Sequence, residues 1–127
     1  MSLGDLYAKH NEHVRFVVIY IREAHPKDGW DYGDISTVND PTSIAQRREL
    51  AKECGVAMKH GIKTYVDKMD DRTMRAYAAF PERLYLIGTD GKVVYRGGLG
   101  PMGFSPQEFA AAIEQELSIA RQAPAKE

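Results

Sequence analysis

The longest uninterrupted run of hydrophobic positions is residues 16–21, with the sequence Phe-Val-Val-Ile-Tyr-Ile. The run is β-branched and aromatic, and it lacks the apolar–polar alternation of a half-exposed strand. This pattern is typical of a strand that is buried on both faces of an α/β sheet. We therefore predict a buried strand over residues 14–21, with a ligand site beyond its carboxyl end.

The hydrophobic periodicity of the whole chain predicts eight elements in the order helix, strand, helix, strand, helix, strand, strand, helix. The first of these strands is residues 14–21. The other predicted elements are helices over residues 3–10, 44–60, 72–78 and 106–121, and strands over 62–66, 83–87 and 93–96. The helix at 3–10 reads as the last turns of a longer one. Thr42 or Ser43 is the expected N-cap of the second helix, and Asp90-Gly91 is a strong turn signal for a hairpin.

Length and charge limit the possible function classes. With 127 residues and a net charge of −1, we expect one α/β domain over residues 1–121 and a disordered tail over 122–127. The charge gives no electrostatic reason for a nucleic-acid partner. No apolar run reaches the length of a membrane span and no signal peptide is visible, so we expect a cytoplasmic protein without a membrane partner.

The single cysteine, Cys54, cannot form an internal disulfide. It falls on the apolar face of the predicted helix, far from the helix N-terminus. We therefore expect a small buried hydrophobic residue rather than a reactive thiol.

Neither a metal site nor a phosphate site is predicted. The glycine-rich stretch at residues 97–103 lacks the spacing of a nucleotide-binding loop. The histidines show no ligand spacing; they are His10, His13, His25 and His60.

Titratable side chains follow the buried strand directly. A histidine titrates near neutral pH, so His25 could transfer a proton, and Glu23, two positions earlier, could orient its ring. Tyr20 could donate a phenolic hydrogen bond into the same place. The alternatives are a loop histidine that bonds only to the backbone and a strand-end tyrosine that packs in the core.

Three separated motifs resemble those of the iodothyronine deiodinases and their bacterial relatives. They are Tyr20-Ile21-Arg22-Glu23-Ala24-His25-Pro26-Lys27-Asp28-Gly29-Trp30, Pro81-Glu82-Arg83-Leu84-Tyr85 and Gly97-Gly98-Leu99-Gly100-Pro101-Met102-Gly103-Phe104-Ser105-Pro106. The segment Asp67-Lys68-Met69-Asp70 also fits the family. The similarity extends over residues 14–117.

The resemblance implies a thioredoxin-like fold and a reductive dehalogenase without a bound cofactor, which takes electrons from an external thiol. Its nucleophile would be a selenocysteine or cysteine, with Tyr20, Glu23 and His25 assisting. Arg83 would grip the carboxylate of a small-molecule substrate, with a cis Pro81 beside it and Trp30 closing the site. Alternatively, Arg83 pairs with a surface carboxylate, Glu82 or Asp67, and Trp30 only fixes its loop.

Two departures from the family pattern change the expectation. The first strand and the nucleophile have no counterpart before Leu3, and Pro41 stands near a position where the family has a substrate-binding histidine. We therefore expect an inactive fragment of an oxidoreductase. A peroxiredoxin-like or disulfide reductase, or a non-catalytic binding module, remains the alternative. Without the first strand, the strands at 14–21 and 83–87 should close against each other, or a second chain should fill the gap in a homodimer.

Overall fold

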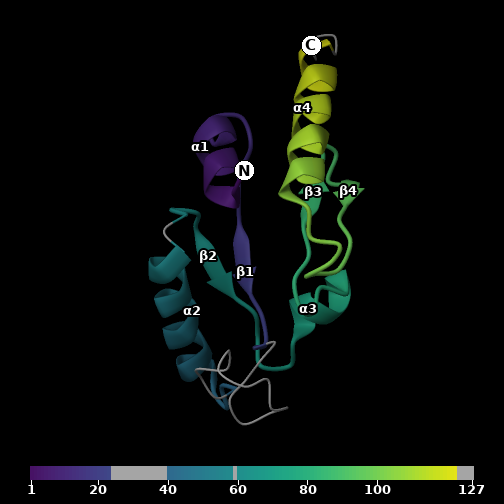
Figure 1. The fold of residues 1–127 in the computed structure, drawn as a ribbon. Helices are drawn as coiled ribbons and strands as arrows, with labels where there is room; N and C mark the ends of the chain where they lie inside the picture. The colour runs from purple at the N-terminus through teal and green to yellow at the C-terminus, as the bar shows by residue number, and fades with distance from the viewer. Residues whose placement is uncertain (24–39, 59, 123–127) are drawn as a thin grey trace. The chain divides into compact units, whose positions relative to one another are not determined.

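The computed structural model describes residues 1–23, 40–58 and 60–122. These residues form four helices and four strands in the predicted order (Figure 1). They divide into two compact units, Phe16–Pro81 and the combination of Met1–Arg15 with Glu82–Glu127, and each unit is described by itself. The single domain over 1–121 and the tail over 122–127 stay predictions.

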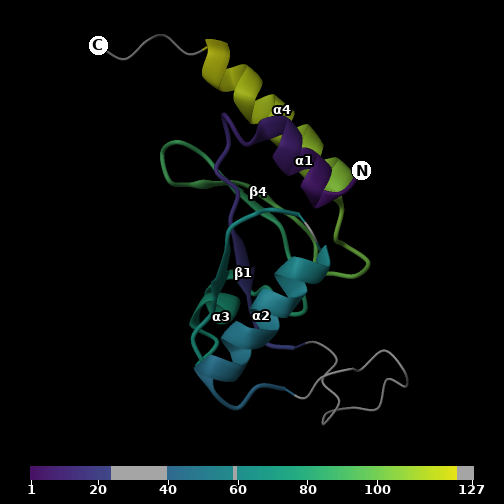
Figure 2. The same ribbon diagram turned by 90° about the vertical axis from the view of Figure 1, so that its left-hand side faces the viewer.

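A parallel βαβ arrangement forms the first part of the Phe16–Pro81 unit. Strand β1 (Val18–Tyr20) pairs in parallel with β2 (Thr64–Val66), so that Ile19 lies beside Tyr65. Parallel neighbours need a crossover connection, and helix α2 (Ile44–Met58) lies on that connection and packs along β2 (Figure 2). The N-terminus of α2 is capped as predicted, because Ser43 Oγ accepts the backbone N–H of Gln46 at 3.2 Å.

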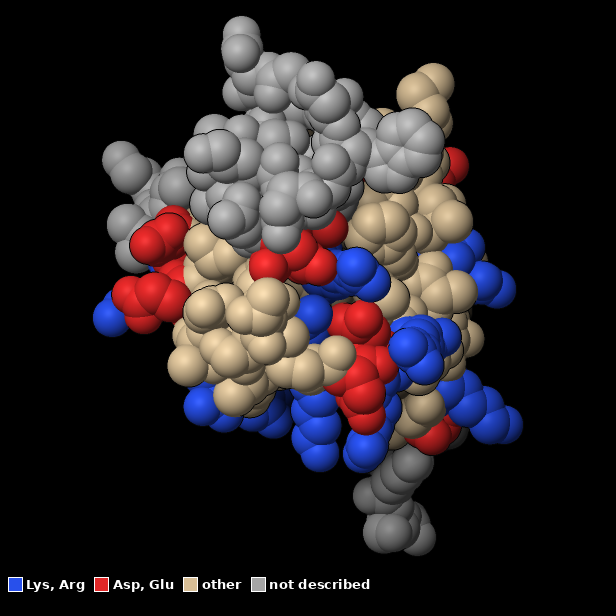
Figure 3. Space-filling model, turned by 90° about the horizontal axis from the view of Figure 1, so that it is seen from below, with Lys and Arg blue, Asp and Glu red and all other residues tan. Residues whose placement is uncertain are grey.

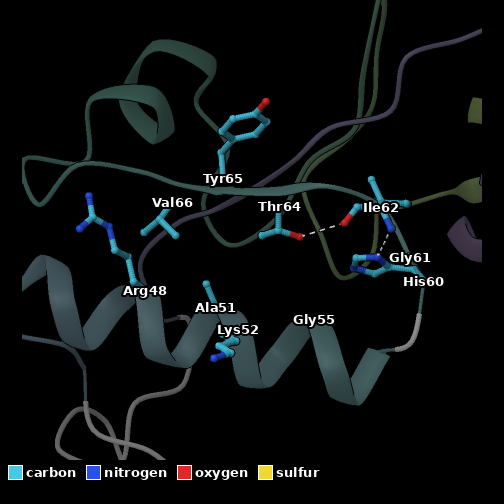
Figure 4. Close-up of a pocket in the computed structure, with 10 residues that line it drawn as sticks. All are labelled: Arg48, Ala51, Lys52, Gly55, His60, Gly61, Ile62, Thr64, Tyr65 and Val66. Carbon is cyan, nitrogen blue, oxygen red and sulfur yellow. Dashed lines mark hydrogen bonds between the residues drawn. The ribbon is translucent and has the colours of Figure 1, made fainter.

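Strand β1 is shorter and more exposed than the hydrophobic run predicts. It spans three residues, and the side chains of Val17 and Ile19 are 47% and 41% exposed, so the prediction of burial on both faces is wrong. The physical reason is that α2 packs on one face of the two-stranded β1–β2 sheet and leaves residues of the other face exposed. Thr64 and Val66 of β2 point toward α2, whereas Tyr65 points the other way (Figure 4) and is 43% exposed. Its neighbour Ile19 shares that outer face.

The second unit is a hairpin packed on the last helix. Strands β3 (Tyr85–Ile87) and β4 (Val93–Arg96) are antiparallel, and α4 (Pro106–Gln122) contacts both of them. Leu86, Phe109 and Ile113 are buried and form its core together with Leu6 of helix α1.

Helix α1 (Leu3–His10) has a capped first turn where the sequence predicts the last turns of a longer helix. Ser2 and Asp5 form a reciprocal capping box, which satisfies two backbone N–H groups. Glu114 of α4 lies 3.0 Å from Lys9 Nζ, so an ion pair links the two helices of this unit.

Strands β1 and β3 belong to different units. In the described part of the chain, β1 pairs with β2 and β3 pairs with β4, in two separate two-stranded sheets, and the predicted closure of β1 against β3 stays a prediction.

Candidate functional site

Tyr20 and Glu23 meet just beyond the carboxyl end of β1. Tyr20 is the last residue of the strand, and its hydroxyl donates a hydrogen bond to Glu23 Oε1. Both residues are half-buried. A phenol that donates to a carboxylate forms a charge-assisted hydrogen bond, so the arrangement fixes the direction of the Tyr20 O–H.

Two other residues of the first motif, His25 and Trp30, lie outside the described residues. Their roles as proton-transfer group and as site closure stay predictions.

Pro81 and Arg83 begin the second motif. The Phe80–Pro81 peptide bond is cis, as predicted, and the structure adds a cis Gly100–Pro101 bond that the sequence did not indicate. Arg83 Nε donates to the carbonyl oxygen of Gly97 at 2.7 Å, and its guanidinium carbon lies 6.0 Å from the centre of the Tyr85 ring. These contacts fix the plane of the guanidinium group.

The predicted site residues fall in different units. Tyr20 and Glu23 belong to Phe16–Pro81, whereas Arg83 belongs to the unit that includes Glu82–Glu127. A common cleft for the three side chains therefore stays a prediction.

Cys54 is exposed, which contradicts the expected burial. A two-stranded sheet covers less of α2 than a full sheet would, so part of the helix's apolar stripe remains in contact with solvent. Partial desolvation raises the pKa of the Cys54 thiol, and the negative charge of Glu23 raises it further. Because the thiolate is the attacking form, both effects oppose a nucleophilic role, in line with the predicted low reactivity.

Arg47 is a structural residue that the sequence analysis did not identify. Its side chain is 2% exposed and reaches from α2 to the segment after β2. It donates to the carbonyl oxygen of Lys68 at 2.8 Å and to Asp71 Oδ1 at 3.0 Å. The available signal was its spacing, because Arg47 stands three residues after Ile44 and four before Ala51 on the apolar stripe.

Asp67 fixes the same segment from the other side. Its carboxylate accepts backbone N–H groups of Lys68, Thr73 and Met74 at 2.9, 3.0 and 2.9 Å. Burial alone would raise the pKa of Asp67, but these hydrogen bonds outweigh it and hold the pKa below its ordinary value. Asp67 thereby caps helix α3 (Arg72–Tyr77), and the family-like segment 67–70 is held by two buried side chains.

Known proteins resemble this chain over most of its length. A family model described as iodothyronine deiodinase matches residues 3–117. The thyroxine 5-deiodinase of Sparus aurata is 39% identical over 100 residues, and that of Ovis aries is 36% identical over 115. The type I iodothyronine deiodinase of Xenopus laevis is 32% identical over 115 residues.

These matches cover 79%, 87% and 91% of this chain respectively, but only 37%, 37% and 45% of the relatives. The chain thus spans less than half the length of the curated relatives it matches.

Fold and site together define a small mixed α/β protein with a tyrosine–carboxylate pair at the end of a parallel strand. The range of the family-model match, residues 3–117, includes all three motifs. The chain belongs to the iodothyronine deiodinase family.

Two features are absent from the described residues. These residues contain no cluster of three His, Cys, Asp or Glu side chains that could hold a metal ion. Among the described helices, none combines the length and hydropathy that a membrane span needs.

Proposed function

We propose that this chain is a thioredoxin-like part of a reductive dehalogenase that removes iodide from an iodinated aromatic amino acid such as thyroxine. Membership of the deiodinase family and the names of the relatives support the reaction class. The observation that carries the proposal is the hydrogen bond from Tyr20 to Glu23, because it joins two of the residues that the family motif suggests for catalysis.

The proposed reaction exchanges a carbon–iodine bond for a carbon–hydrogen bond. A thiolate or selenolate attacks iodine, the electron pair of the broken bond stays on carbon, and that carbon takes a proton. The chalcogen–iodine adduct is then reduced by two equivalents of an external thiol, which release iodide and become a disulfide. His25 would deliver the proton, and the Tyr20–Glu23 pair would orient it and stabilise its charged form.

The attacking atom in this proposal is not Cys54. The sequence contains one cysteine, and its thiol has a raised pKa. The proposal therefore needs a thiol or selenol that these 127 residues do not contain. The chain by itself is expected to release no iodide from thyroxine in the presence of dithiothreitol.

Iodide release from thyroxine tests the proposal in the protein that carries this sequence together with such a thiol or selenol. The variants Tyr20→Phe and Glu23→Gln each lose the pair's contribution to proton transfer. Each should lower kcat by about 10²-fold or more. Tyr65→Phe is the matched control, because Tyr65 is an exposed tyrosine of the same sheet, and it should leave kcat unchanged. Robust turnover by the chain alone that vanishes in Cys54→Ser would overturn the proposal.

A second candidate function is a binding module that keeps the substrate site without the chemistry. A binding role, unlike the dehalogenase reaction, needs no thiol or selenol beyond the single Cys54 of this sequence. Titration of the chain with thyroxine distinguishes it. Saturable binding that Arg83→Ala weakens, without any iodide release in the thiol-containing protein, would favour the binding module over the dehalogenase.

A further inference from the structure

A groove runs between helix α2 and strand β2, and neither Tyr20 nor Glu23 lines it. Its volume is about 760 Å³, within the range of small-molecule sites. Figure 4 shows the helix along one side and the strand along the other. All lining residues belong to the Phe16–Pro81 unit.

Small helix residues create the space. Ala51 and Gly55 lie one turn apart on the face of α2 that borders the groove. A Cβ atom added at Gly55 would meet no atom within 4 Å. The opposite side is formed by Ile62, Thr64 and Val66. The Thr64 hydroxyl donates to the carbonyl oxygen of Ile62 at 3.3 Å, and the other two side chains are apolar.

The lining carries positive but no negative charge in the described part of the chain. On the face drawn in Figure 3, acidic and basic side chains lie beside one another. The groove differs, because Arg48 and Lys52 line it and no Asp or Glu does. Neither cation forms an ion pair among the described residues. They are spaced i, i+4 on α2, where like charges repel, and an anion between them would relieve this repulsion.

His60 supplies a donor at the other end. Figure 4 shows His60 and Arg48 at opposite ends of the groove. The backbone N–H of Ile62 donates to His60 Nδ1 at 3.0 Å. An imidazole that accepts at Nδ1 has Nε2 as its N–H donor, so His60 Nε2 can donate to a ligand.

We propose that this groove binds an elongated organic anion, with its carboxylate at Arg48 and Lys52 and its apolar body between Gly55 and Val66. A polar acceptor at the far end of the ligand would reach His60. This site is separate from the proposed dehalogenase site, so neither proposal depends on the other.

Amide NMR shifts of the isotope-labelled chain, followed during titration with cinnamate, test the site. Saturable shifts are expected in the two segments that line the groove, residues 48–55 and 62–66. The neutral analogue cinnamyl alcohol has the same apolar body, and it should bind about tenfold more weakly because the charge-assisted hydrogen bonds are missing. Shifts confined to other segments, or no saturation, would overturn the proposal.

Variants separate the two parts of the site. Arg48→Ala with Lys52→Ala should weaken cinnamate about tenfold and leave cinnamyl alcohol unchanged. Gly55→Leu should fill the groove and abolish binding of both, while the thermal midpoint stays the same or rises because glycine is a poor helix former.

The control pair, Arg75→Ala with Lys92→Ala, removes the same charge outside the groove and should leave cinnamate affinity unchanged. An equal loss in the control pair, or wild-type affinity in Gly55→Leu, would contradict the proposal. If Gly55→Leu fails to fold, the Arg48 and Lys52 variants decide the question.

Discussion

Arg47 shows how a single buried residue holds one family-like segment in place. Its guanidinium pairs with Asp71 at 3.0 Å, and the two side chains are 2% and 10% exposed. Hydropathy alone ranks arginine among the residues least expected in a core. The only sequence signal for the burial of Arg47 is therefore its position on the apolar stripe of α2.

Removal of the Arg47 charge should destabilise the protein strongly. Arg47→Met leaves Asp71 as a buried charge without its partner, which costs about 3–5 kcal/mol. Urea unfolding measures this loss directly. Arg48→Met, the next residue on the same helix but exposed, is the control and should change the free energy of unfolding little. Equal stability of the two variants would show that the buried pair contributes nothing.

Asp67 should make stability depend on pH in the acid range. Its pKa in the folded protein lies below the ordinary value, so the unfolded chain takes up the proton first on acidification. The contribution of Asp67 is complete above pH about 4 and is lost as the pH falls toward the folded pKa.

Asp67→Asn should lower stability at pH 7 and flatten the decline on acidification. Chemical denaturation at a series of pH values measures both effects. Glu53→Gln, at an exposed position of α2, should retain the wild-type pH dependence. An Asp67→Asn profile parallel to that of the wild type would contradict the role assigned to this carboxylate.

The order of helices and strands follows from the sequence because local signals are strong. The hairpin forms at Asp90-Gly91, where Gly91 has φ 82°, and α4 begins after Ser105, whose Oγ accepts the N–H of Glu108 at 3.2 Å. The prediction of a long β1 strand that is buried on both faces was wrong for a different reason. A hydrophobic run shows which residues gain from burial, but not whether another element covers them.

Loss of the α4 cap should have a moderate cost. Ser105→Ala removes the acceptor for one backbone N–H, and the free energy of unfolding should fall by about 1 kcal/mol. Ser118→Ala, at an exposed position within α4, should be neutral or slightly stabilising because alanine is the better helix former. Thermal unfolding of both variants checks this, and an unchanged midpoint for Ser105→Ala would contradict the capping role.

In the described part of the Phe16–Pro81 unit, the β1–β2 sheet has an exposed apolar face on which Ile19 and Tyr65 are paired neighbours. Such faces are typical of interaction surfaces, so we predict a homodimer. Sedimentation velocity should show dimers that dissociate in Ile19→Lys, since a lysine on that face would be desolvated on association. A wild-type chain that sediments as a monomer at all concentrations would contradict the homodimer.

The sequence predicted the part of the candidate site in which a family-like motif lies at the end of a predicted strand. Tyr20 and Glu23 follow directly from the end of a strand, and the structure joins them by a hydrogen bond. The groove beside α2 left no sequence signal, because it depends on the absence of a side chain at Gly55 and on packing between residues far apart in the chain.

A double-mutant cycle on Tyr20 and Glu23 tests the central claim most directly. It compares kcat for iodide release in Tyr20→Phe, Glu23→Gln and the double variant of the thiol- or selenol-containing protein. Residues that act as one unit give strongly non-additive losses. We predict that the double variant is no slower than the slower single variant. Losses that simply multiply would show that the two side chains act independently and would contradict the proposed pair.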